Sequence, residues 1–520
     1  MIHPYSHYPA RTARRWPDRI ALVDGPRQRS YAQLDQAATK LARVLVDLGL
    51  KPGQRVAFVQ DNCIEYVETV VAIARAGGVL VPLLGALTEN EHAFMVQDAE
   101  ASFVIALDSG AIGRARAAAA GSDAKVLALG PGEDSTDLAA LANSQSDETL
   151  AIERAPDALA QILYTSGTTG HPKGVTHSYA SVGAAMGAWA TAFGVGPGDR
   201  ILGQLALSHF GGRGMDACWI AGGTLVILPA ADPGAMLAAI EEHAITMILV
   251  IPTLLRMLLD HPDAKAADLS SLRVVMYAAA PTAPALVRAS LERLGPVLHT
   301  GFGQTEAYGL NTFMGPEEHV AALEEGGERL VSVGRECAAF AQVRICDEED
   351  NAVAPGEVGE ICVCAPWVTP GFWKRPELDA ERLHQGWLRT GDLGRMDAEG
   401  YVFLADRKED KIISGGFNVY PAEVEGILAE HSAVAECAVF AVPDPKWGEA
   451  VHAAVTLRDG QSADGDGLIE FCREHLARFK VPKGIDVLDE LPKSPVGKIL
   501  RRALREPFWK DQESGVHGAE

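Results

Sequence analysis

Short apolar runs alternate with helical patterns through the first part of this chain, and this alternation restricts the possible folds more than any other feature. A helical pattern of apolar residues begins at Ser30 and stops at Gly49, and an apolar run at residues 55–59 follows at once. Further apolar runs of strand length lie at residues 103–106, 125–129, 161–164, 224–228, 247–251 and 273–277. Alternating strands and helices predict a layered α/β architecture with buried, mostly parallel strands.

The rest of the chain has two other textures. Beyond Gly309, short strands alternate with turn signals, which predicts an antiparallel, β-rich subdomain that closes the large α/β region. After Asp406 the pattern is that of a separate α+β unit. Its predicted elements are helices at residues 421–430 and 467–478 and strands near residues 435–442 and 451–457. We therefore predict an N-terminal domain of residues 1–406 and a small, mobile C-terminal domain of residues 407–520.

The charge balance restricts the partners of this chain. It has 46 basic and 69 acidic residues, a formal net charge of −23, which repels phosphodiester backbones and anionic membrane surfaces. We therefore expect no nucleic-acid partner. The eight cysteines form no Cys-x-x-Cys pair and the N-terminus resembles no secretory signal, which favours a cytoplasmic protein. No apolar stretch reaches the length of a membrane span. The sequence leaves the oligomeric state open, a homo-oligomer included.

The segment YTSGTTGHPKGV at residues 164–175 combines hydroxyls, glycines and one lysine directly after an apolar run. Glycines let backbone N–H groups turn toward an anion, hydroxyls add donors and a lysine adds positive charge, so the segment predicts a phosphate-binding loop. Its candidate phosphate ligands are Thr165, Ser166, Gly167, Thr168, Thr169, Gly170 and Lys173. The alternative is a flexible polar turn. The segment is not a Walker A loop, because it lacks the Gly-Lys-Ser/Thr sequence.

Five more segments accompany this loop. They are LSHFGG at residues 207–212, GFGQTE at 301–306, GWLRTGD at 386–392, the segment 406–425, and PKSPVGK at 492–498. With these six segments in this order, the chain resembles the adenylate-forming superfamily over nearly its whole length. That superfamily includes acyl- and aryl-CoA synthetases, firefly-type luciferases and the adenylation domains of peptide synthetases. The resemblance implies a ligase that activates a carboxylic acid with ATP as an acyl-adenylate and transfers the acyl group to coenzyme A.

The resemblance also implies roles in ATP binding. Thr305 corresponds to a residue that contacts the α-phosphate, and Glu306 to a carboxylate that holds Mg²⁺, a hard cation that prefers oxygen ligands. Phe302 is similar to a ring that stacks on adenine, although many relatives carry Tyr there. The competing interpretation of Phe302 is a core aromatic residue.

Asp392 resembles the aspartate that accepts both ribose hydroxyls, and Arg407 an arginine that also reaches the ribose. An acid after Thr-Gly also caps turns, so Asp392 has a purely structural alternative. The predicted ATP site further includes Ala280 and Pro281.

The predicted acid pocket consists of His209, which is also a catalytic candidate, and Phe210, Gly211, Arg213, Tyr277 and Gly303. Arg213 allows two interpretations. Its guanidinium could pair with a second polar or anionic group on the substrate, which favours a functionalised acid. Alternatively, it pairs with Asp216 one helical turn on, or faces solvent.

The C-terminal domain is expected to complete the active site in two different conformations. Lys498 resembles the lysine that bridges carboxylate and α-phosphate during adenylation, and Glu409 stands at the position of the hinge within residues 406–410. After rotation, the loop after Ser414 is expected to line the pantetheine tunnel. The predicted coenzyme A contacts are Gly415, Gly416, Phe417 and Lys480. For Lys480 the alternative is a basic residue at a helix end.

Other functions compete with an acid–CoA ligase. One is a stand-alone adenylation enzyme that loads a carrier protein; amino-acid-activating domains of that kind place an Asp beside the acid-binding segment, which here reads Ser208-His-Phe-Gly. A luciferase-like oxygenase is a second alternative. A catalytically inactive nucleotide-binding protein is a third, and retention of Lys173, Glu306, Asp392 and Lys498 argues against it.

We predict that Lys498→Ala abolishes acyl-adenylate formation and leaves the conversion of supplied acyl-adenylate to thioester largely intact, because the lysine faces the site in only one conformation. Pyrophosphate exchange measures the first half-reaction, and thioester release from synthetic acyl-adenylate measures the second. Equal losses in both half-reactions would contradict the domain rotation.

Overall fold

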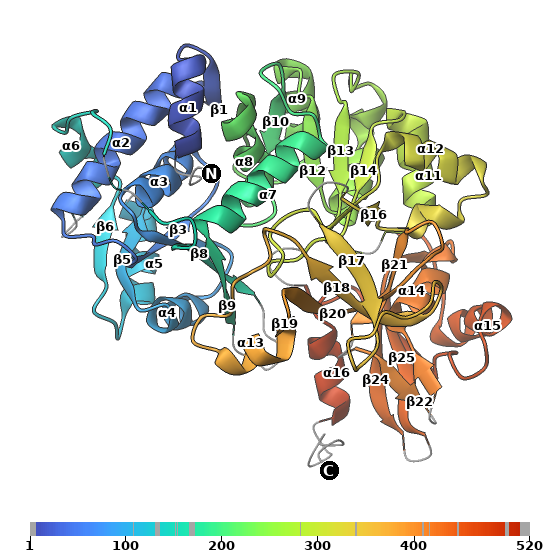
Figure 1. Cartoon of the computed structure of the whole chain (residues 1–520). Coiled ribbons are helices and arrows are strands. Elements are labelled where there is room, and N and C mark those ends of the chain that lie inside the picture. Colours follow the sequence, from blue (N-terminus) through green and yellow to red (C-terminus); the bar gives the residue numbers. More distant parts are fainter. Residues whose placement is uncertain are drawn as a thin grey trace.

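The computed structural model describes residues 7–107, 109–130, 136–150, 152, 154–165, 172–280, 282–337, 341–407, 410–414, 417–444, 447–493 and 499–509. Within these residues, the predicted α/β class is confirmed. Two large, mostly parallel sheets lie in the first part of the chain, and an antiparallel sheet and a smaller α+β unit follow (Figure 1).

The first large sheet has seven strands among the described residues. In spatial order they are β7 (Thr136–Asp137), β6 (Lys125–Ala128), β5 (Ala101–Ala106), β3 (Arg55–Gln60), β4 (Val79–Leu84), β8 (Leu159–Thr165) and β9 (Lys173–Ser178). All neighbouring pairs are parallel except β8 and β9 at the edge, which are antiparallel. The edge pair therefore carries the predicted phosphate loop at its turn.

The second large sheet also has seven strands in the described part of the chain. Their order is β14 (Leu298–Thr300), β13 (Val274–Tyr277), β12 (Met247–Val250), β10 (Arg200–Gly203), β11 (Thr224–Ile227), β1 (Ile20–Asp24) and β2 (Arg27–Ser30). Only β1 and β2 pair antiparallel. The motif at residues 301–306 follows β14 directly, at the carboxyl ends of the parallel strands, where α/β proteins commonly place their sites.

Helices cover both faces of both sheets. Those whose apolar residues join the core between the sheets are α2 (Tyr31–Asp47), α3 (Ile64–Arg75), α7 (Tyr179–Ala192) and α8 (Gly212–Ala221). The outer face of the first sheet packs on α4 (Glu89–Asp98) and α5 (Ser109–Ala119). That of the second packs on α9 (Pro233–His243), α10 (Pro252–Asp260), α11 (Pro284–Leu294) and α12 (Pro316–Glu324). Helices α1 (Tyr8–Arg15) and α6 (Leu138–Asn143) contact α2. The result is a helix–sheet–helix–sheet–helix stack.

The predicted antiparallel subdomain is also present. It consists of β17 (Gln342–Cys346), β18 (Val358–Cys364), β20 (Trp387–Met396), β19 (Leu383–His384) and β21 (Val402–Arg407), with α13 (Pro376–Arg382) before β19. The short pair β15 (Thr312–Phe313) and β16 (Arg335–Glu336) links it to the second large sheet.

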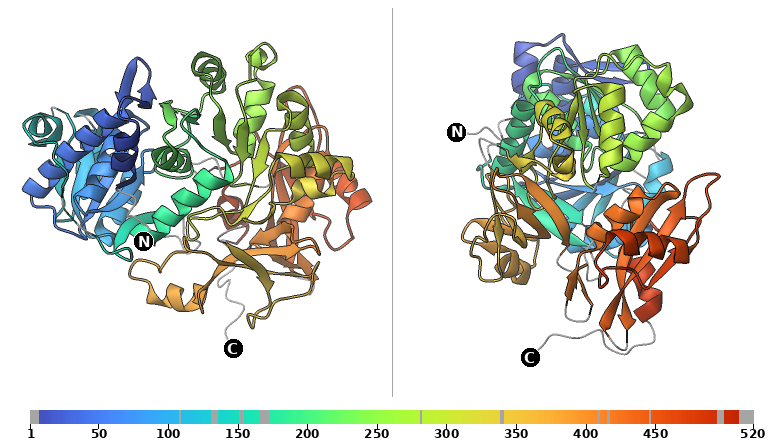
Figure 2. Two further views of the ribbon diagram at one scale, coloured as in Figure 1. Left: turned by 45° about the horizontal axis from the view of Figure 1, so that its top comes forward. Right: turned by 90° about the vertical axis from the view of Figure 1, so that its right-hand side faces the viewer.

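The C-terminal unit has its own sheet and its own apolar core. Its strands are β23 (Phe417–Val419), β22 (Ile412–Ser414), β25 (Gly448–Leu457), β24 (Val434–Asp444) and β26 (Gly484–Val487), and its helices are α14 (Pro421–Glu430), α15 (Gly465–His475) and α16 (Arg501–Trp509). Figure 2 (right) shows this unit, in orange and red, on the same side of the large sheets as the antiparallel strands. The chain leaves one sheet at Arg407 and enters the next at Ile412.

Helix α2 illustrates why local sequence fixes some boundaries. Ser30 is its N-cap and accepts a hydrogen bond from the Gln33 N–H, while the Gln33 side chain accepts from the Ser30 N–H. This capping box satisfies two backbone donors that a helix start leaves unpaired. Tyr31, the first residue of the helix, is fully buried, and its hydroxyl lies 2.8 Å from the Cys218 carbonyl oxygen and 2.7 Å from that of Gly223. The hydroxyl therefore joins the start of α2 to the end of α8.

Tyr31→Phe should lower the thermal midpoint of unfolding, because it removes the buried hydrogen bond that the hydroxyl shares between the Cys218 and Gly223 carbonyl oxygens. The expected loss is roughly 0.5–1.5 kcal/mol, the net contribution of one hydrogen bond, since the Cys218 carbonyl oxygen keeps its bond from the Gly222 N–H. Differential scanning calorimetry measures it. An unchanged midpoint would show that the hydroxyl does not hold the two helices together.

Candidate active site

The ends of the predicted phosphate loop lie opposite one another. Thr165 at the end of β8 pairs with Lys173 at the start of β9, and both side chains are half-buried. The loop between them, with the candidates Ser166, Gly167, Thr168, Thr169 and Gly170, lies outside the described residues. Their phosphate-binding roles stay predictions.

A partly buried carboxylate holds the strand that leads into this loop. Asp98 at the end of α4 accepts a hydrogen bond of 2.7 Å from the Tyr164 hydroxyl and an ion-paired contact of 3.0 Å from Arg375. The indole N–H of Trp373 donates to the Asp98 carbonyl oxygen at 2.8 Å. Burial, with the adjacent carboxylate, raises the pKa of Tyr164 and keeps its phenol protonated. These contacts hold Tyr164, the residue before Thr165 at the end of β8.

A tight turn at Thr305 and Glu306 follows β14 and is fixed to β9. The Thr305 carbonyl oxygen accepts a hydrogen bond from His177 Nε2 at 2.8 Å, and the Glu306 carbonyl oxygen accepts one from the Thr369 N–H at 2.7 Å. Thr369 in turn donates its hydroxyl to the Thr176 carbonyl oxygen at 2.7 Å. The strand that leaves the phosphate loop therefore holds the turn that carries the predicted α-phosphate and Mg²⁺ residues.

The residues present fit Mg²⁺ bound chiefly by a nucleotide. Glu306 is half-buried, so its carboxylate retains access to solvent. Among the described residues, no group of three or more His, Cys, Asp or Glu side chains forms a metal cage. Mg²⁺ needs no such cage, because it usually keeps several waters and binds one or two carboxylates together with phosphate oxygens.

The remaining candidates for the adenine side of the ATP site differ in how exposed they are. Phe302 is only 6% exposed and belongs to the core between the sheets, which is the competing interpretation of that residue. Its stacking on adenine stays a prediction. Ala280 is exposed, and Pro281 lies outside the described residues. Gly303, which was predicted to line the acid pocket, is also exposed.

The two ribose candidates are neighbours in one sheet. Asp392 on β20 is half-buried and pairs with Arg407 on β21. The Asp392 N–H donates to the Thr390 hydroxyl at 3.1 Å, and the Thr390 hydroxyl donates to the Ile361 carbonyl oxygen at 2.7 Å. The side chain of Arg407 lies outside the described residues. The turn before Asp392 is thus anchored to β18.

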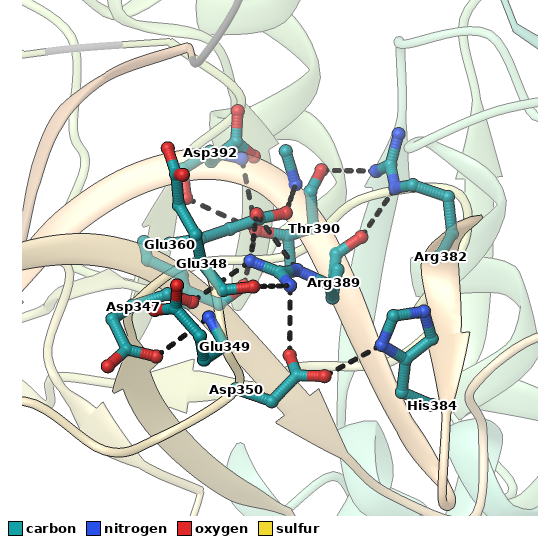
Figure 3. A network of polar contacts seen from close by, with 12 residues as sticks. Asp347, Glu348, Glu349, Asp350, Glu360, Arg382, His384, Arg389, Thr390 and Asp392 are labelled. Carbon is teal, nitrogen blue, oxygen red and sulfur yellow. Dashed lines mark hydrogen bonds and ion pairs between the residues drawn. The ribbon is translucent and has the colours of Figure 1, made fainter.

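A buried ion pair supports this turn from below (Figure 3). The Glu360 carboxylate accepts from Arg389 Nε at 3.0 Å and from the Gly391 N–H at 2.9 Å. Arg389 also forms an ion pair with Asp350 at 3.0 Å. Burial alone would lower the pKa of the Arg389 guanidinium, but the facing Glu360 carboxylate raises it above its ordinary value.

Arg382 adds a second set of donors to the same segment. Its guanidinium donates to the carbonyl oxygens of Arg389 at 2.6 Å and Thr390 at 2.5 Å. Sequence reasoning did not identify Glu360, Arg389 or Arg382 as supports of Asp392. The only sequence signal was an acid and a base on strands with mainly apolar inward positions.

The predicted acid-binding segment forms the turn before α8. The Ser208 hydroxyl lies 3.0 Å from His209 Nδ1, and the Phe210 ring packs edge-on against Trp189 at a centroid distance of 6.0 Å. A Cβ at Gly211 would lie 2.4 Å from the Leu205 carbonyl oxygen, so this position requires glycine. Three of the predicted pocket residues are therefore brought together by one tight turn.

Arg213 on α8 is buried, and its partner is Asp216. One guanidinium nitrogen lies 3.1 Å from the Asp216 carboxylate, and the side chains are 11% and 5% exposed. The guanidinium also stacks on the Tyr308 ring at 3.6 Å from its centroid. The ion-pair interpretation is confirmed, and the solvent-facing one is wrong. Burial raises the pKa of the Asp216 carboxyl, and the guanidinium opposes that rise.

Tyr277 is not brought together with these residues. Its neighbours Met276 and Ala278 join the core between the sheets, but Tyr277 joins the core on the outer face of the second sheet. Its hydroxyl lies 2.9 Å from His319 Nε2 of α12. Successive strand residues point to opposite faces, and the expectation of a pocket role did not take this alternation into account.

The C-terminal candidates are only partly described. Lys498, Glu409, Gly415 and Gly416 lie outside the described residues, as does the side chain of Phe417.

Lys480 does not lie at a helix end, which was the alternative interpretation of this residue. The predicted helix over residues 467–478 ends at His475, so Lys480 lies in the turn that follows α15 rather than at a helix end. Its ammonium lies 2.5 Å from the Glu423 carboxylate. A contact of Lys480 with coenzyme A stays a prediction. In such a contact, a phosphate of coenzyme A would replace the Glu423 carboxylate as the partner of the ammonium.

Across the described residues, none of the helices combines the length and apolar character needed to cross a membrane.

Comparison with known proteins gives matches over both parts of the chain. Residues 9–373 match the sequence family described as AMP-binding enzyme, and residues 423–498 match the AMP-binding enzyme C-terminal domain. Feruloyl-CoA synthase from Amycolatopsis sp is 36% identical over 504 residues, which cover 96% of this chain and 98% of that protein.

Two further similarities bear on the acceptor and on the nucleotide. The fatty acid–[acyl-carrier-protein] ligase ScoC of Streptomyces coeruleorubidus is 34% identical over 509 residues, 96% of each chain. The structure of ATP-bound MatB from Rhodopseudomonas palustris matches with a TM-score of 0.87 and 30% identity, over 97% of this chain and 99% of that one.

Arg213→Leu should destabilise the fold, because it leaves the Asp216 carboxylate buried without a cation. Breaking a buried ion pair costs about 3–5 kcal/mol, whereas replacing both partners by apolar residues is much less costly. Thermal unfolding of Arg213→Leu and of the double variant Arg213→Leu/Asp216→Leu measures the difference. An equal loss in both variants would contradict the ion-pair account.

A substrate contact would give a different signature. If Arg213 also binds a polar group on the acid, Arg213→Leu lowers kcat/KM selectively for dicarboxylic or hydroxylated acids, by about ten- to a hundred-fold. The second substitution at Asp216 would then not restore activity with those acids.

Proposed function

Because this chain belongs to the adenylate-forming superfamily of AMP-binding enzymes, as a ligase of the AMP-forming acyl-CoA synthetase family, we propose that it activates a carboxylic acid with ATP and transfers the acyl group to coenzyme A. The first half-reaction gives an acyl-adenylate and pyrophosphate, and the second gives an acyl-CoA and AMP. We further propose that the reaction takes place in the cytoplasm and uses Mg²⁺.

One observation carries this proposal. The turn of Thr305 and Glu306 is hydrogen-bonded to β9, the strand that leaves the predicted phosphate loop. A hydroxyl suited to an α-phosphate and a carboxylate suited to Mg²⁺ thus lie on a support shared with Lys173. Acyl-adenylate formation requires these groups around one triphosphate, because charge stabilisation and positioning are the main contributions to phosphoryl-transfer catalysis.

In the first half-reaction, a carboxylate oxygen of the acid attacks the α-phosphorus of ATP. A bond forms between that oxygen and phosphorus, and the bond from the α-phosphorus to the bridging oxygen of pyrophosphate breaks. Thr305 donates to the α-phosphate, and Lys173 and Lys498 supply positive charge between two anions that otherwise repel each other. Mg²⁺, held through Glu306, neutralises phosphate charge when bound. Asp392 orients the ribose.

In the second half-reaction, the thiol of coenzyme A attacks the acyl carbon and AMP leaves. No enzyme nucleophile is required, since the mixed anhydride is already activated. The C-terminal domain rotates at Glu409 between the two half-reactions. The rotation removes Lys498 from the active site and brings in the loop at Gly415 and Gly416, so that the thiol can approach the acyl carbon. The name of the relative reported above, feruloyl-CoA synthase, specifies coenzyme A as its acceptor.

A carrier protein is the alternative acceptor. The similarity to the Streptomyces acyl-carrier-protein ligase supports this alternative. Amino acids are disfavoured as substrates, because the buried carboxylate on α8, Asp216, already pairs with Arg213 and cannot also pair with an α-ammonium group. Aryl acids, medium-chain acids and functionalised short acids are all compatible with the proposal. The discriminating experiment supplies the acyl-adenylate with coenzyme A or with an acyl carrier protein and measures each thioester.

Glu306→Gln should reduce ATP–pyrophosphate exchange by about a hundred-fold or more and shift its dependence toward higher Mg²⁺, because a neutral amide binds the ion more weakly than a carboxylate. Exchange is measured with a panel of aryl, medium-chain and hydroxylated acids. The matched control is Glu317→Gln, an exposed glutamate in the first turn of α12. Exchange that is unaffected by Glu306→Gln, or that is absent from the wild type with every acid, would contradict the proposed function.

A further inference from the structure

We propose that His177 is a positioning residue for the turn of Thr305 and Glu306, which it holds through one hydrogen bond from its neutral imidazole. This inference rests on the proposed function, because it concerns the turn that carries the predicted α-phosphate and Mg²⁺ residues. It assigns no contact between His177 and a substrate.

His177 lies at the centre of a buried polar cluster. It is fully buried on β9, and its Nε2 donates to the Thr305 carbonyl oxygen at 2.8 Å. Its ring packs against that of Tyr308, with centroids 4.6 Å apart. The Tyr308 hydroxyl donates to Gln161 at 3.0 Å, and Gln161 is the residue opposite His177 on β8. The imidazole is thus fixed from two sides.

The protonation state of His177 follows from this environment. Burial, helped by the nearby Arg213 charge, lowers the pKa of His177 to about 3, against the opposing effect of the bond to Thr305. The ring is therefore neutral at physiological pH. A carbonyl oxygen can only accept, so the single ring proton resides on Nε2. The hydrogen bond to Thr305 is consequently independent of pH across the neutral range.

The environment of the other ring nitrogen, Nδ1, indicates why a histidine occupies position 177. Nδ1 is buried and has no hydrogen-bond partner among the residues that the structure describes. Burying an unpaired polar atom costs free energy, and an apolar side chain would fill an interior strand position without that cost. The contact from Nε2 to Thr305 is what an apolar residue could not provide.

Two adjacent carbonyl groups of the turn are held in this way. His177 binds the Thr305 carbonyl oxygen, and the Thr369 N–H binds the Glu306 carbonyl oxygen at 2.7 Å. With both carbonyls fixed, the backbone of the turn has a defined orientation, while both side chains remain half-exposed. Loss of the hydrogen bond from His177 removes one of these two contacts and leaves the Thr305 carbonyl oxygen less well positioned. Small misplacements of reacting groups reduce reaction rates steeply.

A stacked arrangement extends from this turn to the acid-binding helix. The Arg213 guanidinium lies 3.6 Å from the centre of the Tyr308 ring, which also packs on His177. His177 itself, however, contacts the nucleotide side of this arrangement. We therefore expect its loss to affect the adenylation rate and Mg²⁺ dependence more than the KM for the acid.

The chain offers a matched control in His92. This histidine is also fully buried, its Nε2 also lies 2.8 Å from a backbone carbonyl oxygen, that of Leu84, and its Nδ1 is likewise without a hydrogen-bond partner among the described residues. It lies on α4, away from the Thr305 turn. A purely structural role for buried histidines predicts the same phenotype at both positions.

The experiment compares wild type, His177→Ala, His177→Gln and His92→Ala. His177→Ala should reduce the kcat of ATP–pyrophosphate exchange by about 10- to 100-fold and shift half-saturation to higher Mg²⁺, with little change in the KM for the acid. His177→Gln retains an amide N–H near the position of Nε2 and should restore most of the lost exchange. His92→Ala should lower the thermal midpoint and leave the exchange rate of the folded protein unchanged.

Binding of MgATP, measured by calorimetry, keeps the test valid if His177→Ala is unstable or if the acid is unidentified. Affinity for MgATP should fall in His177→Ala and recover in His177→Gln, while affinity for ATP in excess EDTA changes little. Equal behaviour of His177→Ala and His92→Ala, or no recovery with Gln, would overturn the proposal. Absence of exchange in the wild type would instead overturn the proposed function, and the calorimetric comparison would still decide the role of His177.

Discussion

The arrangement of this molecule depends on the junction between its two large sheets. The predicted phosphate loop lies between β8 and β9, the edge pair of the first sheet, and the Thr305 turn follows β14 of the second. Neither sheet alone contains both segments that are predicted to bind the triphosphate. Hydrogen bonds from the His177 imidazole and from the Thr369 N–H hold the backbone carbonyl oxygens of this turn. The predicted ATP site therefore depends on the packing of the two sheets rather than on a single motif.

An acidic protein that handles polyanions must place its cations carefully. The net charge is −23, and two of the arginines near the site are already committed to buried carboxylates, Arg213 to Asp216 and Arg389 to Glu360. These pairs orient helices and turns but contribute little net positive charge toward a nucleotide. Lys173 and Lys498 are thus the candidates for stabilising the transition state. In the proposed domain rotation, Lys498 acts in only one half-reaction.

Local sequence predicted much of the fold and less of the site. The start of α2 is encoded by the Ser30 and Gln33 capping box, and the buried strands by short apolar runs. The supports of the site come instead from contacts between distant segments, such as His177 with Thr305 and Asp98 with Arg375, which no local pattern encodes. Tyr277 was predicted to line the acid pocket, but the two-residue period of a strand directs its side chain to the outer face of the second sheet.

In the proposed reaction, a carboxylate oxygen of the acid attacks the α-phosphorus of ATP. A single-turnover reaction with an acid labelled isotopically at both carboxylate oxygens, ATP and coenzyme A tests this directly, with mass spectrometry of the nucleotide product. We expect AMP to carry one labelled oxygen and pyrophosphate to carry none. Unlabelled AMP, or label in inorganic phosphate with release of ADP, would contradict adenylation and require a different activation chemistry for this chain.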